Sequence, residues 1–312
     1  CFLQVFSVIF FIFFVQGKVK FMLDFIINPN AGSFKGRKLK KTLKIIETYL
    51  AKHNIPYTIH RTNYKNHAKT LTSNLITNGA TDIIGIGGDG TLHEIINGFH
   101  SFDKVNLGLI PCGTGNDFAT AIGLPKKKPL KALEIILNND PVYTDYMQMP
   151  GIRGMNIIGA GLDVVVLSKY EKLKHKNKLS YYVCLLKALL TFDNIKFTAT
   201  TEEGSTDYTS FISCIANGKQ FGGGMRICSE ADVADGKLNF VAVNSVKRSK
   251  IPGLLIKFLK GKILDDPGTT MIKTSHIKID TDTPATVNID GELYENIPFE
   301  VSVVTNKLKM YR

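Results

Sequence analysis

The sequence predicts two domains: an α/β domain built on a parallel sheet, followed by a β domain with an antiparallel, sandwich-like sheet. The chain has 312 residues, which exceeds the usual size of about 100–200 residues for one domain. Short apolar runs alternate with helical patterns as far as residue 145, an order typical of a parallel sheet covered by helices. Beyond that point strand-like runs dominate, which favours antiparallel pairing.

The first domain is expected to span residues 21–145, with a helix after most strands. Its first strand is a continuous apolar run at residues 21–27, and its first helix, residues 38–53, carries leucine or isoleucine at every third or fourth position. The same patterns predict further strands at 56–62, 81–87 and 105–111, and helices at 67–78 and 92–99. Ligands of such sheets bind at the carboxyl ends of the strands, so the loops there are the candidate site.

The second domain is expected to span residues 146–312, and its last residues can return to the first domain. Most of its runs are rich in strand-forming residues, and few show a helical pattern. The run GMNIIGAGLDVVV, residues 154–166, is one of these predicted strands. Two helical patterns interrupt them, at residues 179–192 and 250–260.

Residues 1–15 are almost entirely apolar and precede the predicted fold. A helix of that length would span about 22 Å, less than the hydrocarbon core of about 30 Å. No positive charge precedes the run and no small residues follow it, as a secretory signal would require. We therefore expect residues 1–20 to lie outside the fold, with the biological start near Met22; a short membrane anchor and a secretory signal are the alternatives.

The composition indicates a reduced globular protein with anionic partners. Lys and Arg number 39 against 27 Asp and Glu, which gives a formal net charge of +12. This excess favours nucleotide phosphates, nucleic acid or an acidic membrane surface as partners, without choosing among them. The five cysteines include no C-x-x-C pair, which argues against a zinc ribbon and a disulfide scaffold and favours a cytoplasmic protein.

The loop after the first strand is the first candidate site. It contains, in order, Asn28, Pro29, Asn30, Ala31 and Gly32. Asn, Pro and Gly are typical of a tight turn, and small residues with free backbone N–H groups let a phosphate approach closely. The alternative is a turn without a binding role.

The loop after the strand at 81–87 is rich in glycine around a single aspartate. Gly85, Gly87 and Gly90 match the pattern G-x-G-x-x-G. A dinucleotide site of that type would also have an acidic residue at the end of the next strand, where this chain has Pro111. We therefore expect the loop to hold phosphates at a helix N-terminus, with Asp89 either binding Mg²⁺ or accepting a proton. The alternative is that Asp89 only caps the following helix.

The third loop, residues 111–119, again follows a strand. The Thr114 hydroxyl can donate to phosphate oxygens, and Asn116 or Asp117 can cap a helix or bind a ribose. A glycine-rich turn with a helix cap is the simpler interpretation of this loop taken alone. The chain has neither the P-loop pattern G-x-x-x-x-G-K-[ST] nor the motifs of protein kinases.

The three loops together resemble the diacylglycerol kinase catalytic domain, and most of all the soluble bacterial lipid kinases. GGDGT at residues 87–91 is shared with NAD kinases and sphingosine kinases. GGDGT followed about 20 residues later by P-x-GT-x-ND-F-A is more specific to the lipid kinases. The C-terminal part agrees, with DVADGKL at residues 232–238 and NIDGE at 288–292, so the resemblance covers residues 22–312.

The resemblance implies a Rossmann-like nucleotide-binding domain with the ATP site between the two domains. The positions that match the nucleotide contacts of the family are Asn28, Pro29, Asn30, Ala31, Gly32, Thr62, Gly87, Gly88, Asp89, Gly90, Thr91, Leu92, His93 and Thr114. The family often has asparagine where this chain has His93. No other histidine lies at metal-ligand spacing, so His93 is better explained as a residue of a helix face than as a metal ligand.

The resemblance also implies catalytic and metal-binding carboxylates. Glu292 matches the family's proton acceptor, although the residues around it would by themselves predict a simple hairpin. Asp89 and Asp145 match two aspartates near the phosphates, where they would help to hold Mg²⁺. A structural Mg²⁺ site in the second domain matches Asp235, flanked by Asp232 and Lys237. Lys237 could contribute only its backbone carbonyl, because its ammonium group repels a cation.

The expected activity is transfer of the ATP γ-phosphate to a lipid hydroxyl, with diacylglycerol as the leading acceptor. Monoacylglycerol, undecaprenol, phosphatidylglycerol and sphingoid bases also present a primary hydroxyl. Residues 249–263 combine an apolar helix face with lysines, a pattern that can lie on an anionic bilayer or can simply cover the sheet. Lysine runs at 126–128 and 168–178 add positive charge. We expect a cytoplasmic protein on the inner face of the membrane, and the resemblance makes a homodimer plausible.

Three other functions compete with this interpretation. An NAD kinase shares GGDGT and the two-domain plan, but the ND-F-A element argues against it. A catalytically inactive regulator that binds nucleotide or lipid would not need Asp89, Asp145 and Glu292. A nucleic-acid-binding protein is indicated only by the positive charge, and no nucleic-acid module is recognisable.

Overall fold

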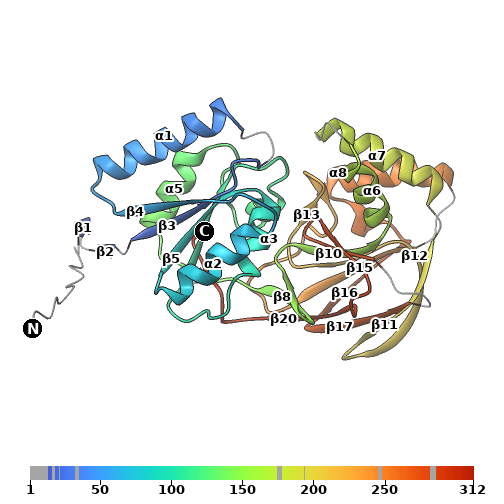
Figure 1. The fold of residues 1–312 in the computed structure, drawn as a ribbon. Coiled ribbons are helices and arrows are strands. Elements are labelled where there is room, and N and C mark those ends of the chain that lie inside the picture. Colours follow the sequence, from blue (N-terminus) through green and yellow to red (C-terminus); the bar gives the residue numbers. More distant parts are fainter. Residues whose placement is uncertain are drawn as a thin grey trace, which may run out of the picture.

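The computed structural model describes residues 13–15, 18–20, 22–31, 35–173, 178–192, 194–244, 248–281 and 286–312. These residues form two domains that lie side by side (Figure 1). The first domain, coloured blue to green, holds a parallel sheet between helices, and the second holds a large antiparallel sheet. The predicted fold class, parallel α/β followed by antiparallel β, is therefore confirmed.

The sheet of the first domain has six strands in the order β4-β3-β5-β6-β21-β7. Their bounds are β3 (Leu23–Ile27), β4 (Tyr57–Arg61), β5 (Asp82–Gly87), β6 (Asn106–Pro111), β7 (Val142–Tyr143) and β21 (Lys309–Met310). The pairs from β4 to β21 are all parallel, and only β7 runs antiparallel to its neighbour. Strand β21 comes from the C-terminal end of the chain, so the chain returns to the first domain after building the second.

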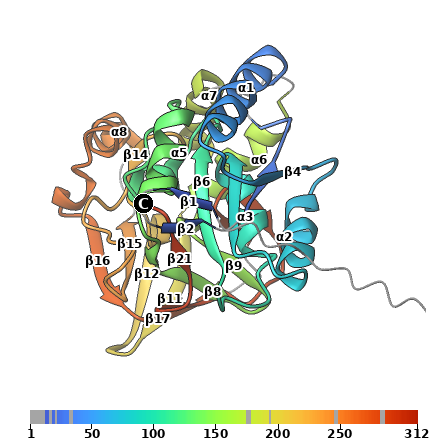
Figure 2. The same ribbon diagram turned by 90° about the vertical axis from the view of Figure 1, so that its left-hand side faces the viewer.

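Helices cover both faces of this sheet. They are α1 (Arg37–Lys52), α2 (His67–Thr77), α3 (Asp89–Ile96), α4 (Asp117–Ala121) and α5 (Pro129–Asn138). Helices α1 and α5 pack on one face and α2 and α3 on the other (Figures 1 and 2). Leucine and isoleucine side chains of α1, such as Leu43 and Ile46, are buried against Phe25 of the sheet. Each such side chain contributes roughly 1.5–3 kcal/mol through burial.

The second domain contains a network of eleven antiparallel strands. They are β8 (Tyr146–Met149), β9 (Ile152–Gly154), β10 (Ile157–Gly161), β11 (Ile195–Thr201), β12 (Gly204–Ala216), β15 (Leu238–Asn244), β16 (Thr269–Thr274), β17 (His276–Thr281), β18 (Val287–Ile289), β19 (Glu292–Tyr294) and β20 (Glu300–Val304). The path branches at β12, which pairs with β10, β11 and β15. Two separate hairpins, β1 (Phe13–Val15) with β2 (Lys18–Lys20) and β13 (Gln220–Phe221) with β14 (Met225–Arg226), complete the strands.

Three helices, α6 (Leu162–Glu171), α7 (Lys178–Thr191) and α8 (Ile251–Lys260), pack over one part of this network. Two short 3-10 turns, Arg248–Lys250 and Ile263–Asp265, flank α8. The two helices predicted in this domain correspond to α7 and α8. The prediction of a strand through residues 162–166 was wrong, because α6 begins there.

The start of α6 shows why that prediction failed. Gly161 has a φ of +118°, a conformation that a glycine adopts easily and that ends strand β10. Asp163 then lies in the first helical turn, where a negative charge is favourable. Leu162 and Val166 are buried in the core beneath α7. Tertiary packing therefore outweighs the strand preference of the three consecutive valines.

Helix α8 covers the sheet, as one interpretation of its amphipathic pattern predicted, and contact with a bilayer stays a prediction. Its Leu254 and Phe258 are buried against the sheet, whereas Ile256 and Leu259 are exposed. Among the described helices, none is long and apolar enough to cross a membrane. Most of the apolar N-terminal segment, residues 1–12, lies outside the described residues.

Candidate functional site

The second and third loops predicted from the sequence lie against each other, because they follow the adjacent parallel strands β5 and β6. A Cβ atom added to Gly113 would lie 2.5 Å from the Cα atom of Gly88. Only residues without a side chain allow this approach. Asn116 holds the third loop in shape, since its side chain accepts from the N–H of Gly113 at 2.8 Å and donates to the carbonyl of the same residue at 2.9 Å.

The first loop follows β3, at the same edge of the sheet. The Asn28 side chain accepts a hydrogen bond from the N–H of Asn30 at 2.9 Å and so fixes the turn. Asn28 and Pro29 are partly exposed, Asn30 is exposed and Ala31 is buried, while Gly32 lies outside the described residues. Thr62 is buried at the end of β4 and donates its N–H to the carbonyl of Ile27 at 2.9 Å. The structure thus gathers the described parts of all three loops at one edge.

Asp89 is the first residue of α3 and faces a second carboxylate. Its Oδ1 accepts a hydrogen bond from the N–H of Phe118 at 3.2 Å. The Oδ2 atoms of Asp89 and Asp117 lie 3.1 and 3.2 Å from the position that a Cβ on Gly115 would occupy. Burial, together with the nearby charge of Asp117, raises the pKa of Asp89 to about 6. Two carboxylates at a helix N-terminus form a place where a cation or a shared proton would relieve repulsion.

Asp117 also connects the two domains. It accepts hydrogen bonds from the side-chain amide of Gln220 at 2.6 Å and from the N–H of Gly223 at 2.7 Å. Lys126 Nζ lies 3.9 Å from its Oδ1 and donates to the carbonyl of Gly115 at 2.9 Å. The sequence indicated only a helix cap or a ribose contact for Asp117. Its partners in the second domain are too distant in sequence for a local pattern to reveal them.

The side chains that follow Asp89 on α3 point into the protein. Thr91, Leu92 and His93 are all buried. The Nε2 atom of His93 lies 2.8 Å from the hydroxyl of Tyr294, and its Nδ1 lies 3.4 Å from Oδ2 of Asp290. His93 therefore links the domains, in agreement with a role on a helix face. Any nucleotide contact of these three residues would have to use their backbone.

Glu292 reaches the glycine-rich loop from the second domain. Its Oε1 lies 3.7 Å from the position of a Cβ on Gly90, at the first turn of α3. Its Oε2 accepts a hydrogen bond from Nζ of Lys65 at 2.7 Å, and this carboxylate raises the pKa of Lys65. The Glu292 side chain is 29% exposed, which leaves it accessible. Lys65 lies just before α2, in a segment without a recognisable motif, and was not identified from the sequence.

The turn that carries Glu292 is anchored by its neighbour Asp290. The Asp290 carboxylate accepts three backbone hydrogen bonds, from Met155 at 2.6 Å, Asn156 at 2.8 Å and Ile157 at 3.1 Å. The NIDGE segment is thus a hairpin, as its residues alone predicted, and this hairpin brings Glu292 to the glycine-rich loop at Gly90.

Asp145, the other aspartate expected near the phosphates, contacts a turn of the second domain. It is buried, and its Oδ2 accepts a hydrogen bond from the N–H of Gly236 at 2.8 Å. Burial raises the pKa of Asp145, and the charges of Asp235 and Asp232 raise it further. Asn217 also donates its side-chain amide to the backbone carbonyl of Asp145 at 2.9 Å. That Asp89 and Asp145 together hold one cation stays a prediction.

The predicted metal site at residues 232–237 has suitable donors in a compact turn. Asp232 accepts from the N–H of Ala234 at 3.1 Å, and Asp235 accepts from the N–H of Lys237 at 3.0 Å. Lys273 Nζ lies 3.5 Å from Oδ2 of Asp235. Carboxylate and carbonyl oxygens are the donors that Mg²⁺ prefers, so the chemistry of the turn fits the metal. In the part of the chain that the structure describes, no three His, Cys, Asp or Glu side chains gather closely enough to form a metal centre.

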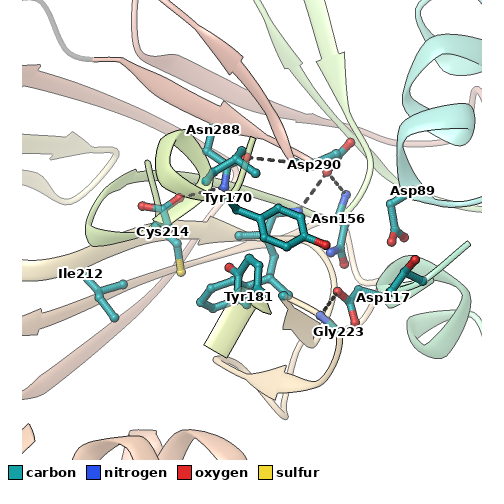
Figure 3. A pocket seen from close by; sticks show the side chains of 18 residues that line it. Asp89, Asp117, Asn156, Tyr170, Tyr181, Ile212, Cys214, Gly223, Asn288 and Asp290 are labelled. Atoms are coloured by element: carbon teal, nitrogen blue, oxygen red, sulfur yellow. Dashed lines mark hydrogen bonds between the residues drawn. The ribbon is translucent and has the colours of Figure 1, made fainter. Parts of the chain in front are cut away.

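A cavity of about 240 Å³ opens between the domains beside these loops. Its loop end is formed by Asp89, Thr114, Gly115 and Asp117, and its helix end by Leu167, Tyr170, Tyr181, Ile212 and Phe221. Figure 3 shows the rings of Tyr170 and Tyr181 between Asp89 and Asp117 on one side and Ile212 and Cys214 on the other. The cavity is therefore polar at one end and mainly apolar at the other.

Comparison with known families finds two matches that together cover most of the chain. Residues 22–149 match the diacylglycerol kinase catalytic domain. Residues 156–312 match the YegS C-terminal NAD kinase beta sandwich-like domain. A diacylglycerol kinase of Mycobacterium tuberculosis is 28% identical over 256 residues, 78% of this chain and 81% of the relative. A diacylglycerol kinase of Bacillus subtilis is 28% identical over 225 residues, 70% and 73% of the two chains.

Solved structures show the same fold. A crystal structure of a diacylglycerol kinase from Bacillus anthracis superposes with a TM-score of 0.71 at 21% identity, covering 93% of this chain and 96% of the other. An NAD kinase from Archaeoglobus fulgidus in complex with ATP superposes less closely, with a TM-score of 0.52 at 11% identity over 93% and 94% of the two chains.

Proposed function

The chain belongs to the bacterial family of diacylglycerol kinases and YegS-like lipid kinases, and on this premise we propose that it transfers the γ-phosphate of ATP to a lipid hydroxyl. Diacylglycerol is the expected acceptor and phosphatidic acid the product. One observation carries the proposal: Glu292 and the glycine-rich loops meet beside a cavity that is polar at one end and apolar at the other. A phosphate donor and an amphiphilic acceptor would meet there.

The glycine-rich loops supply the features that bind phosphates. The close approach of Gly88 and Gly113 keeps side chains away from the N-terminus of α3, whose partial positive charge favours anions. Thr114 is exposed beside it and can donate its hydroxyl. A structure with a similar fold, an NAD kinase, was solved in complex with ATP, which is consistent with ATP as the phosphate donor. We infer that the phosphates of ATP lie over the three loops.

Glu292 is the proposed proton acceptor. As the lipid oxygen forms a bond to the γ-phosphorus, the bond between that phosphorus and the bridging oxygen breaks and ADP leaves. The hydroxyl proton passes to the Glu292 carboxylate, which is accessible and borders the first turn of α3. Lys65 neutralises this carboxylate in the structure, and its exposed ammonium is free to turn toward phosphate when ATP binds.

Asp89 and Asp117 are the residues that would hold Mg²⁺ at the loop end of the cavity. Their converging carboxylates and the raised pKa of Asp89 indicate a need for positive charge. When bound, the cation would neutralise charge on the phosphate oxygens. Asp232 and Asp235 would hold a second, structural cation, with the carbonyl of Lys237 as a further donor.

The acceptor would come from a membrane surface. Helix α7 exposes Leu179, Val183 and Leu186, which recur at the spacing of one helix face, and α8 exposes Ile256 and Leu259. Lysines on both helices add positive charge near these side chains. We propose that this surface rests on the anionic inner leaflet, where each lysine close to the lipid would add about 1 kcal/mol.

Phosphate transfer from γ-labelled ATP with Mg²⁺ tests the proposed activity. Diacylglycerol in anionic mixed micelles and, separately, NAD would serve as acceptors. We expect label in the lipid fraction. Label only in NADP would assign the chain to the NAD kinases instead, and the absence of label from both acceptors would contradict the proposal for diacylglycerol.

A further inference from the structure

Helix α3 turns one face toward the second domain. Asp89 and His93 on this helix, and Asn97 directly after it, follow one another at intervals of four residues, so they share that face. The Asn97 side chain donates to the carbonyl of Arg153 at 3.0 Å and accepts from the N–H of the same residue at 2.8 Å. Arg153 in turn donates to two backbone carbonyls at the end of the helix. The C-terminal end of α3 is thereby fixed to strand β9.

Strand β19, which carries Glu292, follows a turn with little conformational freedom. The two central residues of this turn, Asp290 and Gly291, have φ values of +54° and +96°, and β18 pairs with β19 directly across it. Two positive φ values are typical of a type I′ turn, for which Asp-Gly is a preferred sequence. Asn288 accepts from the N–H of Gly291 at 2.9 Å and donates to Asp163 at 3.0 Å. The turn is therefore held firmly, and the place of Glu292 depends on where β19 lies.

Glu292 and Tyr294 point to the same face of β19, because side chains two residues apart on a strand share a face. Both side chains meet α3. Oε1 of Glu292 lies 3.7 Å from the position of a Cβ on Gly90, in the first turn of the helix. The Tyr294 hydroxyl lies 2.8 Å from Nε2 of His93, one turn further along. Strand β19 thus runs along α3, and the contact between His93 and Tyr294 sets its position along the helix.

The His93 ring has two partners, both from the second domain. Its Nδ1 lies 3.4 Å from Oδ2 of Asp290, and a carboxylate can only accept, so Nδ1 carries the proton and Nε2 accepts from the Tyr294 hydroxyl. Burial, together with the nearby charge of Glu292, raises the pKa of Tyr294 to about 12, so this hydroxyl keeps its proton. The side chains of His93 and Asp290 are 4% and 3% exposed, against 72% for Lys65, the other partner of Glu292. Water therefore competes little with the contacts of His93.

We propose that His93 and Tyr294 form a positioning pair that fixes Glu292 over the first turn of α3. This inference rests on the proposed function, because it takes Glu292 as the proton acceptor. The pair acts through strand β19 and does not touch the reacting atoms. A displacement of a reacting group by about 1 Å can cost a factor of about 100 in rate. Loss of the pair should therefore lower kcat and leave the binding of ATP unchanged.

Tyr294→Phe tests the pair by removing only the hydroxyl. The kcat for phosphate transfer to diacylglycerol should fall about tenfold, and the KM for ATP should stay at the parent value. Tyr208→Phe is the matched control, at a partly buried tyrosine on β12, and should behave as the parent does. A pair that served stability alone would instead lower the melting temperature and leave kcat unchanged.

Two substitutions of His93 separate the contacts of its ring. Glutamine carries its amide far enough to accept from the Tyr294 hydroxyl, whereas asparagine is one carbon shorter and can meet only Asp290. We expect His93→Gln to keep most of the parent kcat and His93→Asn to lose as much as Tyr294→Phe. The double variant His93→Asn/Tyr294→Phe should lose no more than either single variant, because both changes remove the same contact. Losses that multiply, or equal losses in the glutamine and asparagine variants, would contradict the pair.

Hydrogen exchange of backbone amides tests the pair without any substrate. In the full chain, the amides of residues 288–294 should exchange about tenfold faster in Tyr294→Phe and His93→Asn than in the parent, while those of α5 keep the parent rates. If the hairpin exchanges at the parent rate in both variants, the inference is overturned. If the parent transfers no phosphate, the proposed function fails, and faster exchange in both variants would still support a pair that fixes Glu292.

Discussion

At the loop end of the cavity the chain presents backbone and carboxylates, whereas at the helix end it presents apolar side chains. The loop end depends on Gly88 and Gly113, whose close contact admits no side chain. The helix end is assembled from α6, α7, α8 and β12, which are separated by long stretches of sequence. We propose that the two ends serve different steps: the loop end would hold and transfer phosphate, and the helix end would select the acceptor. Changes at the loop end should therefore alter turnover with any lipid, and changes at the helix end should alter only the choice of lipid.

The largest effect is expected from Glu292→Gln. Removal of a general base costs roughly 10²–10⁴-fold in rate, and kcat should fall within that range for every lipid acceptor. Folding should be unaffected, because the ion pair with the exposed Lys65 contributes little. Glu295→Gln, an exposed neighbour, is the control and should keep parent activity. Normal turnover in Glu292→Gln would show that the hairpin only shapes the site.

Gly113→Ala should have the next largest effect. The added methyl group would lie 2.5 Å from Gly88, so the two loops must move apart. We expect the KM for ATP to rise about tenfold and the free energy of unfolding to fall by about 1–3 kcal/mol. In Gly253→Ala the new methyl group meets no atom within 4 Å, and the KM for ATP should not change. An unchanged KM in Gly113→Ala would mean that the phosphates bind elsewhere.

Asp89→Asn should separate stability from activity at the loop end. Because the pKa of Asp89 is raised to about 6 in the folded state, the folded protein holds this proton more tightly than the unfolded chain does. The unfolding free energy therefore falls as pH rises from about 4 to 6. The asparagine side chain does not titrate, so the variant avoids this pH-dependent loss of unfolding free energy. It should be about 1–2 kcal/mol more stable than the parent at pH 7.5 and equal to it near pH 4.

Urea unfolding at the two pH values measures this difference, and Asp103→Asn, an exposed site in the same domain, serves as the control. The same Asp89→Asn preparation should have lost phosphate transfer. A variant that is less stable at pH 7.5 would identify Asp89 as a helix cap, which was the alternative that its sequence position left open.

The smallest effect is expected from Lys65→Met. The ion pair with Glu292 is mostly exposed, with 72% exposure of the lysine side chain, and such pairs contribute about 0–1 kcal/mol. Stability should therefore change by less than that amount, and kcat/KM by only a few-fold. A loss of activity as large as that of Glu292→Gln would place Lys65 among the essential phosphate contacts and extend the loop end toward α2.

The difference between the loop end and the helix end also explains which residues of the candidate site could be predicted from the sequence. The glycine loops were predictable, because close backbone contacts allow few residue types and so leave a compact motif. Glu292 was predictable only through the family resemblance, since NIDGE by itself describes a hairpin. Lys65 and Asp163 could not be identified as candidates, because each meets its hydrogen-bond partner more than a hundred residues away. Asp163 was further hidden by the strand predicted across the start of α6.

Parallel kinetics of Glu292→Gln and Leu255→Trp test the division between the two ends most directly. Both variants would be assayed with γ-labelled ATP over a range of dioctanoylglycerol concentrations. The account predicts that Glu292→Gln lowers kcat by at least 100-fold with little change in lipid KM. It predicts that Leu255→Trp, which would fill the apolar cavity under α8 from a partly buried position, raises lipid KM about tenfold and leaves the KM for ATP unchanged. If both variants change only kcat or both change only the lipid KM, or if Leu255→Trp lowers kcat alone, the two ends do not serve separate steps as proposed.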